Sequence, residues 1–477
     1  MSSAASEQST GATSTTETAT PPTTSTNRRQ PFGQGFLDTI STGWAERPDT
    51  EPPARPQAPF AARRRDAVSA AFPGKRLVIP AGELKQRSND TDYPFRAHSA
   101  FSHLTGWASD SEPGAVLVFE PRSSGGHDVT LYFRERADRT TSEFYSDASI
   151  GEFWIGPRPA LAGVAADLAL ATAHIDDFES GDGDVVLDED DDLTRFVSEL
   201  RLVKDAYEIG QMELAVQVTA SGFDDIVANL PAIVEHPRGE RVVEGVFHQR
   251  ARSDGNAVGY DTIAASGPHA CYLHWTRNDG AVVPGDLILI DAGVEVDSLY
   301  TADITRTLPV SGRFTDVQRK VYETVREAAD AAFAAARPGV KFRSVHEAAM
   351  QVIAARVAEW GLLPVTAEEA LDADSGGHHR RYMVHGTSHH LGIDVHDCAQ
   401  ARRDMYYDGI LEAGMVFTIE PGLYFQIDDL TVPEEYRGIG VRIEDDILMT
   451  EEGPVNLSAA IPRTADEVEA WIAAGGR

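Results

Sequence analysis

The stretch from His385 to His396 constrains this chain more than any other part of its sequence. It reads HGTSHHLGIDVH, with four histidines in twelve residues, and Leu391, Ile393 and Val395 alternate with other residues. Alternation with a period of two is typical of a β-strand, so we expect an imidazole-rich strand here. Neutral imidazole and carboxylate oxygen together bind divalent metals such as Mn, Co or Zn. The stretch therefore predicts a metal site if carboxylates approach it.

Four acidic residues in other segments are suited to that role: Asp291, Asp303, Glu420 and Glu444. Each lies at or near the end of a short apolar run, where a buried charge is costly unless a cation or a donor compensates it. A single acid in such a place is more often a cap or turn residue, so the prediction depends on the set. Four carboxylates and the imidazole of His389 nearly neutralise two divalent ions, and bridging carboxylates hold such ions about 3.5–4 Å apart.

The other histidines of the stretch are expected to do something different. His385 and His396 flank His389 at separations of four and seven residues. One extended segment cannot bring all three side chains to one ion. We therefore expect some of them to face the substrate.

Two further residues are candidates for the same site. Arg442 lies two residues before Glu444, on the same face of a strand, where a guanidinium can hold a carboxylate or a tyrosine in place. His274 lies among aromatic residues in YLHWT. For His274 the sequence leaves a packed imidazole and an active-site residue equally open.

Composition excludes several classes of function. Lys and Arg number 42 against 75 Asp and Glu, a formal net charge of −33. An acidic surface repels nucleic acid and anionic membranes, so neither is expected as a partner.

The N-terminal segment lacks the features of a secretory signal, and no run approaches the roughly 18 apolar residues of a membrane helix. Only two cysteines occur, Cys271 and Cys398, which favours a reducing, cytoplasmic compartment over a disulfide framework.

The length of 477 residues is sufficient for two domains of ordinary size. We expect a disordered Ser/Thr/Pro-rich tail over residues 1–59, an N-terminal domain over 60–198 and a catalytic domain over 199–477. Within the tail, an aromatic piece at 32–37 is a candidate for docking on the folded body or on a neighbouring subunit.

The expected elements indicate an α+β class. Capping boxes at Thr315–Gln318 and Ser344–Glu347 predict two helices, which end near Pro338 and Gly361. Several strands follow one another without crossover helices, which favours an antiparallel or mixed sheet with helices on one face. The expected strands span residues 287–290, 304–310, 382–384, 416–419, 438–443 and 447–449.

Five motifs in this order resemble the pita-bread dinuclear metallopeptidases, most closely the Xaa-Pro aminopeptidase (aminopeptidase P) family. The likeness covers about residues 61–477 and leaves out the N-terminal tail. The motifs are DAG at Asp291, DITRT at Asp303, HGTSHHLGIDVHD at His385, EPGLY at Glu420 and GVRIEDD at Gly440.

The resemblance implies a creatinase-like N-terminal domain followed by a pita-bread catalytic domain, in which helices cover an antiparallel or mixed sheet. It also implies two divalent ions, usually Mn²⁺, and a homo-oligomer, either a dimer or a tetramer. The metal ligands that it implies are Asp291, Asp303, His389, Glu420 and Glu444. The active-site residues that it implies are His274, His385, His396, Tyr424 and Arg442, with Glu420 as the proton shuttle and Arg201 as a weaker match at the domain junction.

The implied activity is release of the N-terminal residue from peptides with proline in the second position. A hydroxide that bridges the two metals would attack the carbonyl before the proline nitrogen. The alternative is a prolidase, which cleaves Xaa-Pro dipeptides and would use the same ligands. The sequence Thr-Ser-His-His at residues 387–390 favours the aminopeptidase. A metal-free binding module of the same fold would have neutral residues at the ligand positions, and none of the five is replaced.

One spacing departs from the family pattern. Asp291 and Asp303 are separated by twelve positions, one more than the family leads us to expect. We expect a β-bulge or a longer turn to absorb the extra residue. Otherwise the two carboxylates would face opposite sides of the sheet.

Overall fold

The computed structural model describes residues 32–48, 51–89 and 91–476. These residues divide into two compact units. One consists of residues 32–48, 84–94 and 136–158, and the other of residues 51–83, 95–135 and 159–476. This division does not follow the predicted boundary at residue 198. Residues 1–31 of the predicted tail lie outside the described residues.

Aromatic packing holds the first unit together. α1 (Gln34–Ile40) places Phe36 against Tyr145, with ring centroids 5.2 Å apart, and Trp44 packs edge-on against Phe144 at 5.5 Å. Residues 32–48 therefore differ from the predicted disordered tail, because their aromatic side chains find apolar partners. The unit also contains β2 (Gln86–Ser88), β3 (Thr91–Asp92), α4 (Glu143–Ser146) and α5 (Glu152–Ile155).

A five-stranded mixed sheet forms the N-terminal part of the second unit. Its strand order is β6-β5-β4-β1-β7, and the two outer pairs are parallel while the inner pairs are antiparallel. Buried apolar side chains between Val68 and Val197 form one core around it. The elements are α2 (Ala58–Ala71), β1 (Leu77–Pro80), α3 (Ser99–Thr105), β4 (Val116–Pro121), β5 (His127–Phe133), α6 (Leu161–Leu168), β6 (Ala171–His174), β7 (Val185–Val186) and α7 (Asp191–Glu199).

The second half of the chain is built on short antiparallel ladders, as the sequence predicted. β10 pairs with β9 and β12, β16 pairs with β13 and β17, β14 pairs with β15, and β11 pairs with β8. Their bounds are β8 (Ala257–Val258), β9 (Ile263–Ser266), β10 (Leu287–Ala292), β11 (Val294–Glu295), β12 (Ile304–Pro309), β13 (Val416–Ile419), β14 (Gly422–Tyr424), β15 (Gly440–Arg442), β16 (Asp445–Thr450) and β17 (Gly453–Asn456).

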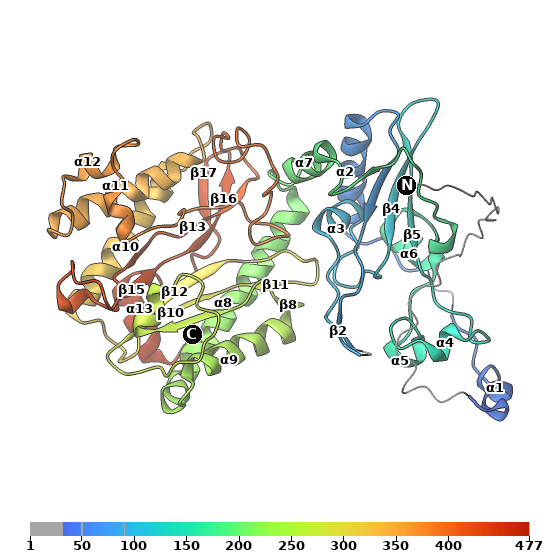
Figure 1. The fold of residues 1–477 in the computed structure, drawn as a ribbon, viewed down its shortest axis with the longest axis horizontal. Coiled ribbons are helices and arrows are strands. Elements are labelled where there is room, and N and C mark those ends of the chain that lie inside the picture. The colour runs from blue at the N-terminus through green and yellow to red at the C-terminus, as the bar shows by residue number, and fades with distance from the viewer. Residues whose placement is uncertain (1–31, 49–50, 90, 477) are drawn as a thin grey trace, which may run out of the picture. The chain divides into compact units, whose positions relative to one another are not determined.

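Two helix pairs pack against these ladders. Figure 1 shows the strands between α8 with α9, drawn in green, and α10 with α11, drawn in orange. A second hydrophobic core fills the space between them, and apart from Ala108 its buried members run from Leu202 to Trp471. The helices are α8 (Ala206–Glu235), α9 (Gly239–Asp254), α10 (Asp316–Ala335), α11 (Arg343–Glu359), α12 (Ala367–Leu371) and α13 (Ala465–Ala474).

The histidine-rich stretch is not a regular strand. It runs beside β13 over a few residues, where Thr418 N donates to His389 O and Leu391 N donates to Val416 O. Beyond Leu391 the chain bends away, and a bridge between His390 and Phe417 is its single β-type pairing among the described residues. The predicted strand is therefore wrong, because the alternating apolar residues after Leu391 pack around a bend.

Two other local predictions need correction. The helix α11 begins at Arg343 after Phe342, without a side-chain cap, so the capping box predicted at Ser344 does not form. Phe342 is buried and packs against Phe417, with ring centroids 5.5 Å apart, and this packing anchors the helix start. Residues 382–384 form no strand, because a 3₁₀ turn at His378–Arg381 precedes them. By contrast, the box at Thr315 caps α10 as predicted.

No helix in the described part of the chain is long and apolar enough to cross a membrane.

Candidate metal centre

Asp291 and Asp303 lie on the same face of the β10–β12 ladder. Asp291 stands opposite Thr305, and Asp303 is two residues from Thr305, so all three side chains point to one side. The ladder has no register shift between residues 287 and 309. The extra residue is absorbed instead by the turn around Leu299, which adopts the left-handed conformation with φ of 70°.

Tyr260 joins the two carboxylates, and sequence reasoning missed it. Its hydroxyl lies 2.6 Å from Asp291 Oδ1 and 2.5 Å from Asp303 Oδ1. A phenol has one hydrogen, so the two acids compete for a single donor. Burial, together with the charges of Asp291 and Asp303, raises the pKa of Tyr260 well above its usual value.

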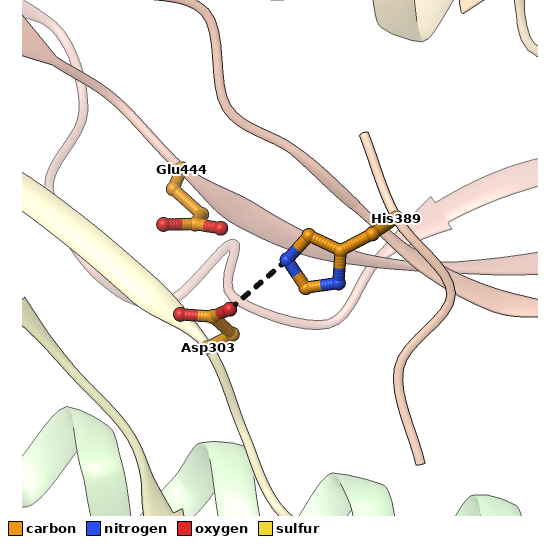
Figure 2. A group of neighbouring side chains, drawn as sticks. All are labelled: Asp303, His389 and Glu444. Atoms are coloured by element: carbon orange, nitrogen blue, oxygen red, sulfur yellow. Dashed lines mark ion pairs between the residues drawn. The ribbon is translucent and has the colours of Figure 1, made fainter. Parts of the chain in front are cut away.

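His389 and Glu444 approach the same point from other segments. His389 Nε2 lies 3.2 Å from Asp303 Oδ2, and Figure 2 shows the imidazole directed at that carboxylate with Glu444 beside it. One ligand atom from each of these three residues lies within 4.8 Å of the others. Three of the five predicted ligands thus meet in space although they are up to 141 positions apart in the chain.

Glu444 provides a direct test of whether a cation fits here. Its Oε2 accepts a hydrogen bond of 2.7 Å from Thr305 Oγ1, but Oε1 is buried and has no hydrogen-bond partner among the residues that the structure describes. A buried carboxylate oxygen without a donor is costly unless a cation compensates it. The donor set of carboxylate oxygens and one imidazole suits divalent ions of the Mn or Zn kind.

Glu420 follows β13 directly and faces two histidines. Its carboxylate lies 3.7 Å from His389 Nε2 and 3.6 Å from His385 Nδ1. The backbone N–H of Glu420 donates to Thr387 O, which ties the end of β13 to the histidine-rich stretch. Burial raises the pKa of Glu420 to about 7, against the opposing effect of His389.

The remaining predicted residues surround this group. His385 Nε2 lies 2.8 Å from the Tyr424 hydroxyl, which in turn accepts a hydrogen bond of 3.1 Å from Arg442 Nη1. The ring of His396 lies 4.0 Å from that of His389. His274 is exposed and makes no side-chain hydrogen bond within the described residues.

A cavity of about 580 Å³ contains the site. Nine of the ten predicted site residues line it, and Tyr424 lies behind His385 as its partner. The lining also includes the apolar side chains of Ile263, Leu273 and Val395. Such a combination of apolar walls and a few converging polar groups is typical of a binding site for a small ligand or a peptide end.

Burial and like charges shape the protonation of the site. Desolvation, reinforced by neighbouring carboxylates, raises the pKa of Glu444 well above its usual value and also raises that of Asp303. Burial alone would lower the pKa of His389, but its hydrogen bond to Asp303 and the charge of Glu420 raise it to about 9. His385 is different: burial and the charge of Arg442 lower its pKa to about 3. Opposite shifts in adjacent groups are characteristic of functional sites.

Arg201 lies away from the cavity. Its Nε donates a hydrogen bond of 2.8 Å to Asp397 Oδ1, and both side chains are buried. The pairing ties the segment before α8 to the residue that follows His396. Arg201 therefore does not contact the candidate metal ligands, and its predicted place at a domain junction stays a prediction.

Two family models match the chain. One, described as metallopeptidase family M24, matches residues 210–451, and the other, described as aminopeptidase P, N-terminal domain, matches residues 60–183. The Xaa-Pro aminopeptidase 2 of Streptomyces coelicolor is 51% identical over 457 residues, which cover 91% of this chain and 95% of that protein. The Xaa-Pro aminopeptidase of Escherichia coli is 33% identical over 455 residues, or 87% of this chain and 97% of that one.

Solved structures give the same result for the fold. The aminopeptidase PepP of Pseudomonas aeruginosa superposes with a TM-score of 0.74 at 32% identity, over 88% of this chain and 99% of that one. A zinc-substituted E. coli aminopeptidase P in complex with product superposes with a TM-score of 0.75 at 31% identity, over 88% and 99% of the two chains.

Proposed function

This chain belongs to metallopeptidase family M24, and from that premise we propose that it releases the N-terminal residue from peptides with proline in the second position. The family resemblance, the α+β fold with its two domains and the hydrolase class inferred from the motifs are confirmed by the matches. The observation that supports the reaction most strongly is the convergence of four carboxylates and His389 in one cavity.

The residues that would hold two divalent ions are those of the predicted set. They are Asp291, Asp303, His389, Glu420 and Glu444. The unpartnered oxygen of Glu444 and the raised carboxyl pKa values support this assignment, because both indicate anionic groups without compensating charge. When bound, such ions act as Lewis acids that polarise a carbonyl and make water more acidic. We propose Mn²⁺ as the native metal, as the sequence resemblance implies.

The surrounding side chains bind and orient the peptide in this proposal. His274 and His385 donate hydrogen bonds to the carbonyl that is attacked, and His396 holds the peptide backbone. Glu420 carries a proton from the attacking water to the proline nitrogen, because its carboxylate lies within 3.7 Å of both His389 and His385, between the proposed ligands and the residues that face the peptide. Arg442 and Tyr424 keep Asp291 and His385 in place.

A comparison of three peptides tests the function. Purified protein is incubated with Arg-Pro-Pro, Gly-Pro and Arg-Ala-Ala, first with EDTA and then after addition of Mn²⁺. We expect arginine release from Arg-Pro-Pro alone, lost in EDTA and restored by Mn²⁺. Cleavage of Gly-Pro alone would show a prolidase instead, and metal-independent or absent cleavage would refute the proposal.

We propose residues 60–198 and 199–477 as the two domains. The two hydrophobic cores support this boundary, since one ends at Val197 and, apart from Ala108, the other begins at Leu202. The matched ranges of the two family models, 60–183 and 210–451, lie on either side of it. Limited proteolysis would test the boundary, with stable fragments expected to begin or end near residue 200.

Cytoplasmic location and self-association are further proposals. Cys271 and Cys398 are both buried and free, which suits a reducing compartment. Phe153, Trp154 and Ile155 on α5 expose 61%, 58% and 53% of their surfaces, and exposed large apolar side chains are common at protein interfaces. Light scattering should then show a dimer or tetramer that Trp154→Lys disrupts, and a monomeric wild type would contradict the proposal.

A further inference from the structure

One fully buried carboxylate collects hydrogen bonds from the segment that carries His274. Glu240, on α9, is 0% exposed. Its Oε1 accepts hydrogen bonds of 2.8 Å from Ser266 N and His269 Nδ1, and its Oε2 accepts bonds of 3.0 Å from Trp275 Nε1 and 2.7 Å from Gly280 N. All four donors lie within residues 266–280, so a single side chain on a helix organises this whole segment.

The position of His274 is not fixed by a hydrogen bond of its own side chain within the described residues. Its exposed ring lines the cavity and makes no side-chain hydrogen bond within the described residues. Its neighbour Trp275, in contrast, stacks on His269 with ring centroids 3.9 Å apart and has the Arg277 guanidinium over its ring, 4.2 Å from the centroid. The position of His274 therefore depends on the residues that Glu240 holds.

The same helix also supports the far end of the segment. Asn278 Nδ2 donates to Glu244 Oε2 at 3.1 Å and to Thr262 O at 2.8 Å, and Asn278 Oδ1 accepts from Ala264 N at 3.0 Å. A Cβ on Gly280 would come within 2.8 Å of Glu240 Oε2, so the backbone approaches the carboxylate as closely as glycine permits. The segment is thus fixed to α9 at several points around His274.

We propose that Glu240 is a positioning residue for the reaction, which acts by holding His274 at the cavity wall. This inference rests on the proposed function, in which His274 contacts the peptide. Glu240 lies outside the group of predicted metal ligands and reaches the substrate only through the 266–280 segment. Its effect on catalysis should therefore require the imidazole of His274.

The substitution Glu240→Gln tests whether Glu240 acts by accepting hydrogen bonds or only by occupying the buried space. The N–H groups of Ser266, Trp275 and Gly280 can only donate, and His269 Nδ1 donates to the carboxylate in one tautomer of its ring. A glutamine of the same shape turns one oxygen into an NH₂ group, which cannot accept from any of these three N–H groups, whereas His269 can change tautomer and accept from it. At least one hydrogen bond is then lost and at least one N–H group is left unsatisfied, so the segment shifts.

A double-mutant cycle on the metal-loaded full-length protein tests the proposal. We expect Glu240→Gln to lower kcat/KM for Arg-Pro-Pro about tenfold or more in the wild-type background, but less than about twofold in a His274→Ala background, because the two residues act as one unit. The number of bound metal ions should stay unchanged. Equal losses in both backgrounds would overturn the proposal.

An activity-independent readout distinguishes failure of this inference from failure of the proposed function. Diethyl pyrocarbonate modifies exposed histidines, and mass spectrometry compares His274 with His236, which is also exposed. We expect Glu240→Gln to change the relative modification rate of His274 at least about twofold by releasing the segment. If the wild type cleaves no peptide but this rate changes, the function fails and the positioning role stands. An unchanged rate overturns the role itself.

Two further variants control for stability. Phe247→Leu alters the buried core of α9, where Phe247 packs on Phe223, and should lower the melting temperature without lowering kcat/KM. Trp275→Phe keeps the ring but removes one donor to Glu240. If Glu240→Gln does not fold, Trp275→Phe carries the same test, with a smaller loss that should also vanish in the His274→Ala background.

Discussion

Arg442 Nη2 donates a hydrogen bond of 2.5 Å to Asp291 Oδ2, and both side chains are buried. The same guanidinium donates to Thr305 Oγ1 and to the Tyr424 hydroxyl, each at 3.1 Å. One side chain on β15 thus joins residues of β10, β12 and β14. Three simultaneous contacts of this kind depend on the planar, forked shape of arginine.

Replacing Arg442 with lysine should therefore be far from conservative. Lysine keeps the charge but cannot reach Asp291, Thr305 and Tyr424 together, so we expect kcat/KM to fall about a hundredfold and Mn²⁺ affinity about tenfold. Arg64→Lys is the matched control, because Arg64 is also buried but donates to Asp205 and to His103 O, and it does not line the cavity. It should cost stability and leave metal affinity unchanged; equal effects on metal affinity would contradict this account.

Tyr260→Phe removes the hydroxyl that Asp291 and Asp303 share. Loss of an outer hydrogen bond to metal ligands typically weakens metal affinity 10- to 100-fold, and we expect a change of about tenfold, measured by titration of metal-free protein. Tyr300→Phe provides the comparison, since its buried hydroxyl donates to Glu208 at 2.7 Å, away from the cavity. If both variants bind Mn²⁺ like the wild type, Tyr260 has no part in the site.

Gly293→Ala should destabilise the protein strongly. Gly293 lies between β10 and β11, and a Cβ there would come 1.6 Å from the carbonyl oxygen of Ala302, next to Asp303. The backbone must move, which costs about 3 kcal/mol or more by analogy with overpacked cores. Gly245→Ala, on α9 with open space around it, should be neutral or slightly stabilising. Denaturant unfolding of both variants checks the contrast, and similar stabilities would count against the structure at this point.

The stability of the metal-free protein should fall as the pH rises from 7 to 8.5. The folded-state pKa of His389, about 9, lies above its ordinary value of about 6.5, so the native state retains a proton that the unfolded chain releases. The stability that this proton contributes is present below the unfolded pKa and is lost as pH rises through the folded one.

Added metal ions should oppose this loss of stability at high pH. Ligands bind divalent ions only when deprotonated, so the gain in melting temperature on adding Mn²⁺ should be larger at pH 8.5 than at pH 7. Thermal unfolding of metal-free and Mn²⁺-loaded samples at both values measures the two gains. A gain that is the same at both values would show that His389 does not release a proton when metal binds.

The set of acids and His389 could be predicted from the sequence because each residue belongs to a short local motif. Asp291 and Glu420 come directly after apolar runs, and those runs became the buried strands β10 and β13. The same reasoning wrongly predicted a β-strand in the histidine-rich stretch, because the alternating apolar residues after Leu391 lie in a bend that packs against the core. Periodicity reports which residues are buried and does not distinguish a strand from a bend.

Tyr260 and Glu240 could not be found in this way. Neither belongs to a motif, and their roles depend on partners 26 to 43 positions away in the chain. Glu240 in particular occupies the start of an ordinary helix, where a first-turn glutamate is expected to be solvated. Only the packing of α9 against the 266–280 segment turns it into a buried acceptor.

The most direct test of the central claim follows bound metal and activity in the same samples. Metal-free protein is titrated with Mn²⁺, the bound metal is measured by elemental analysis, and arginine release from Arg-Pro-Pro is recorded at each step. We predict that release rises with metal content and saturates at two ions per chain, and that Asp303→Asn binds less metal and releases little arginine. Full release from protein that holds no metal would contradict the account.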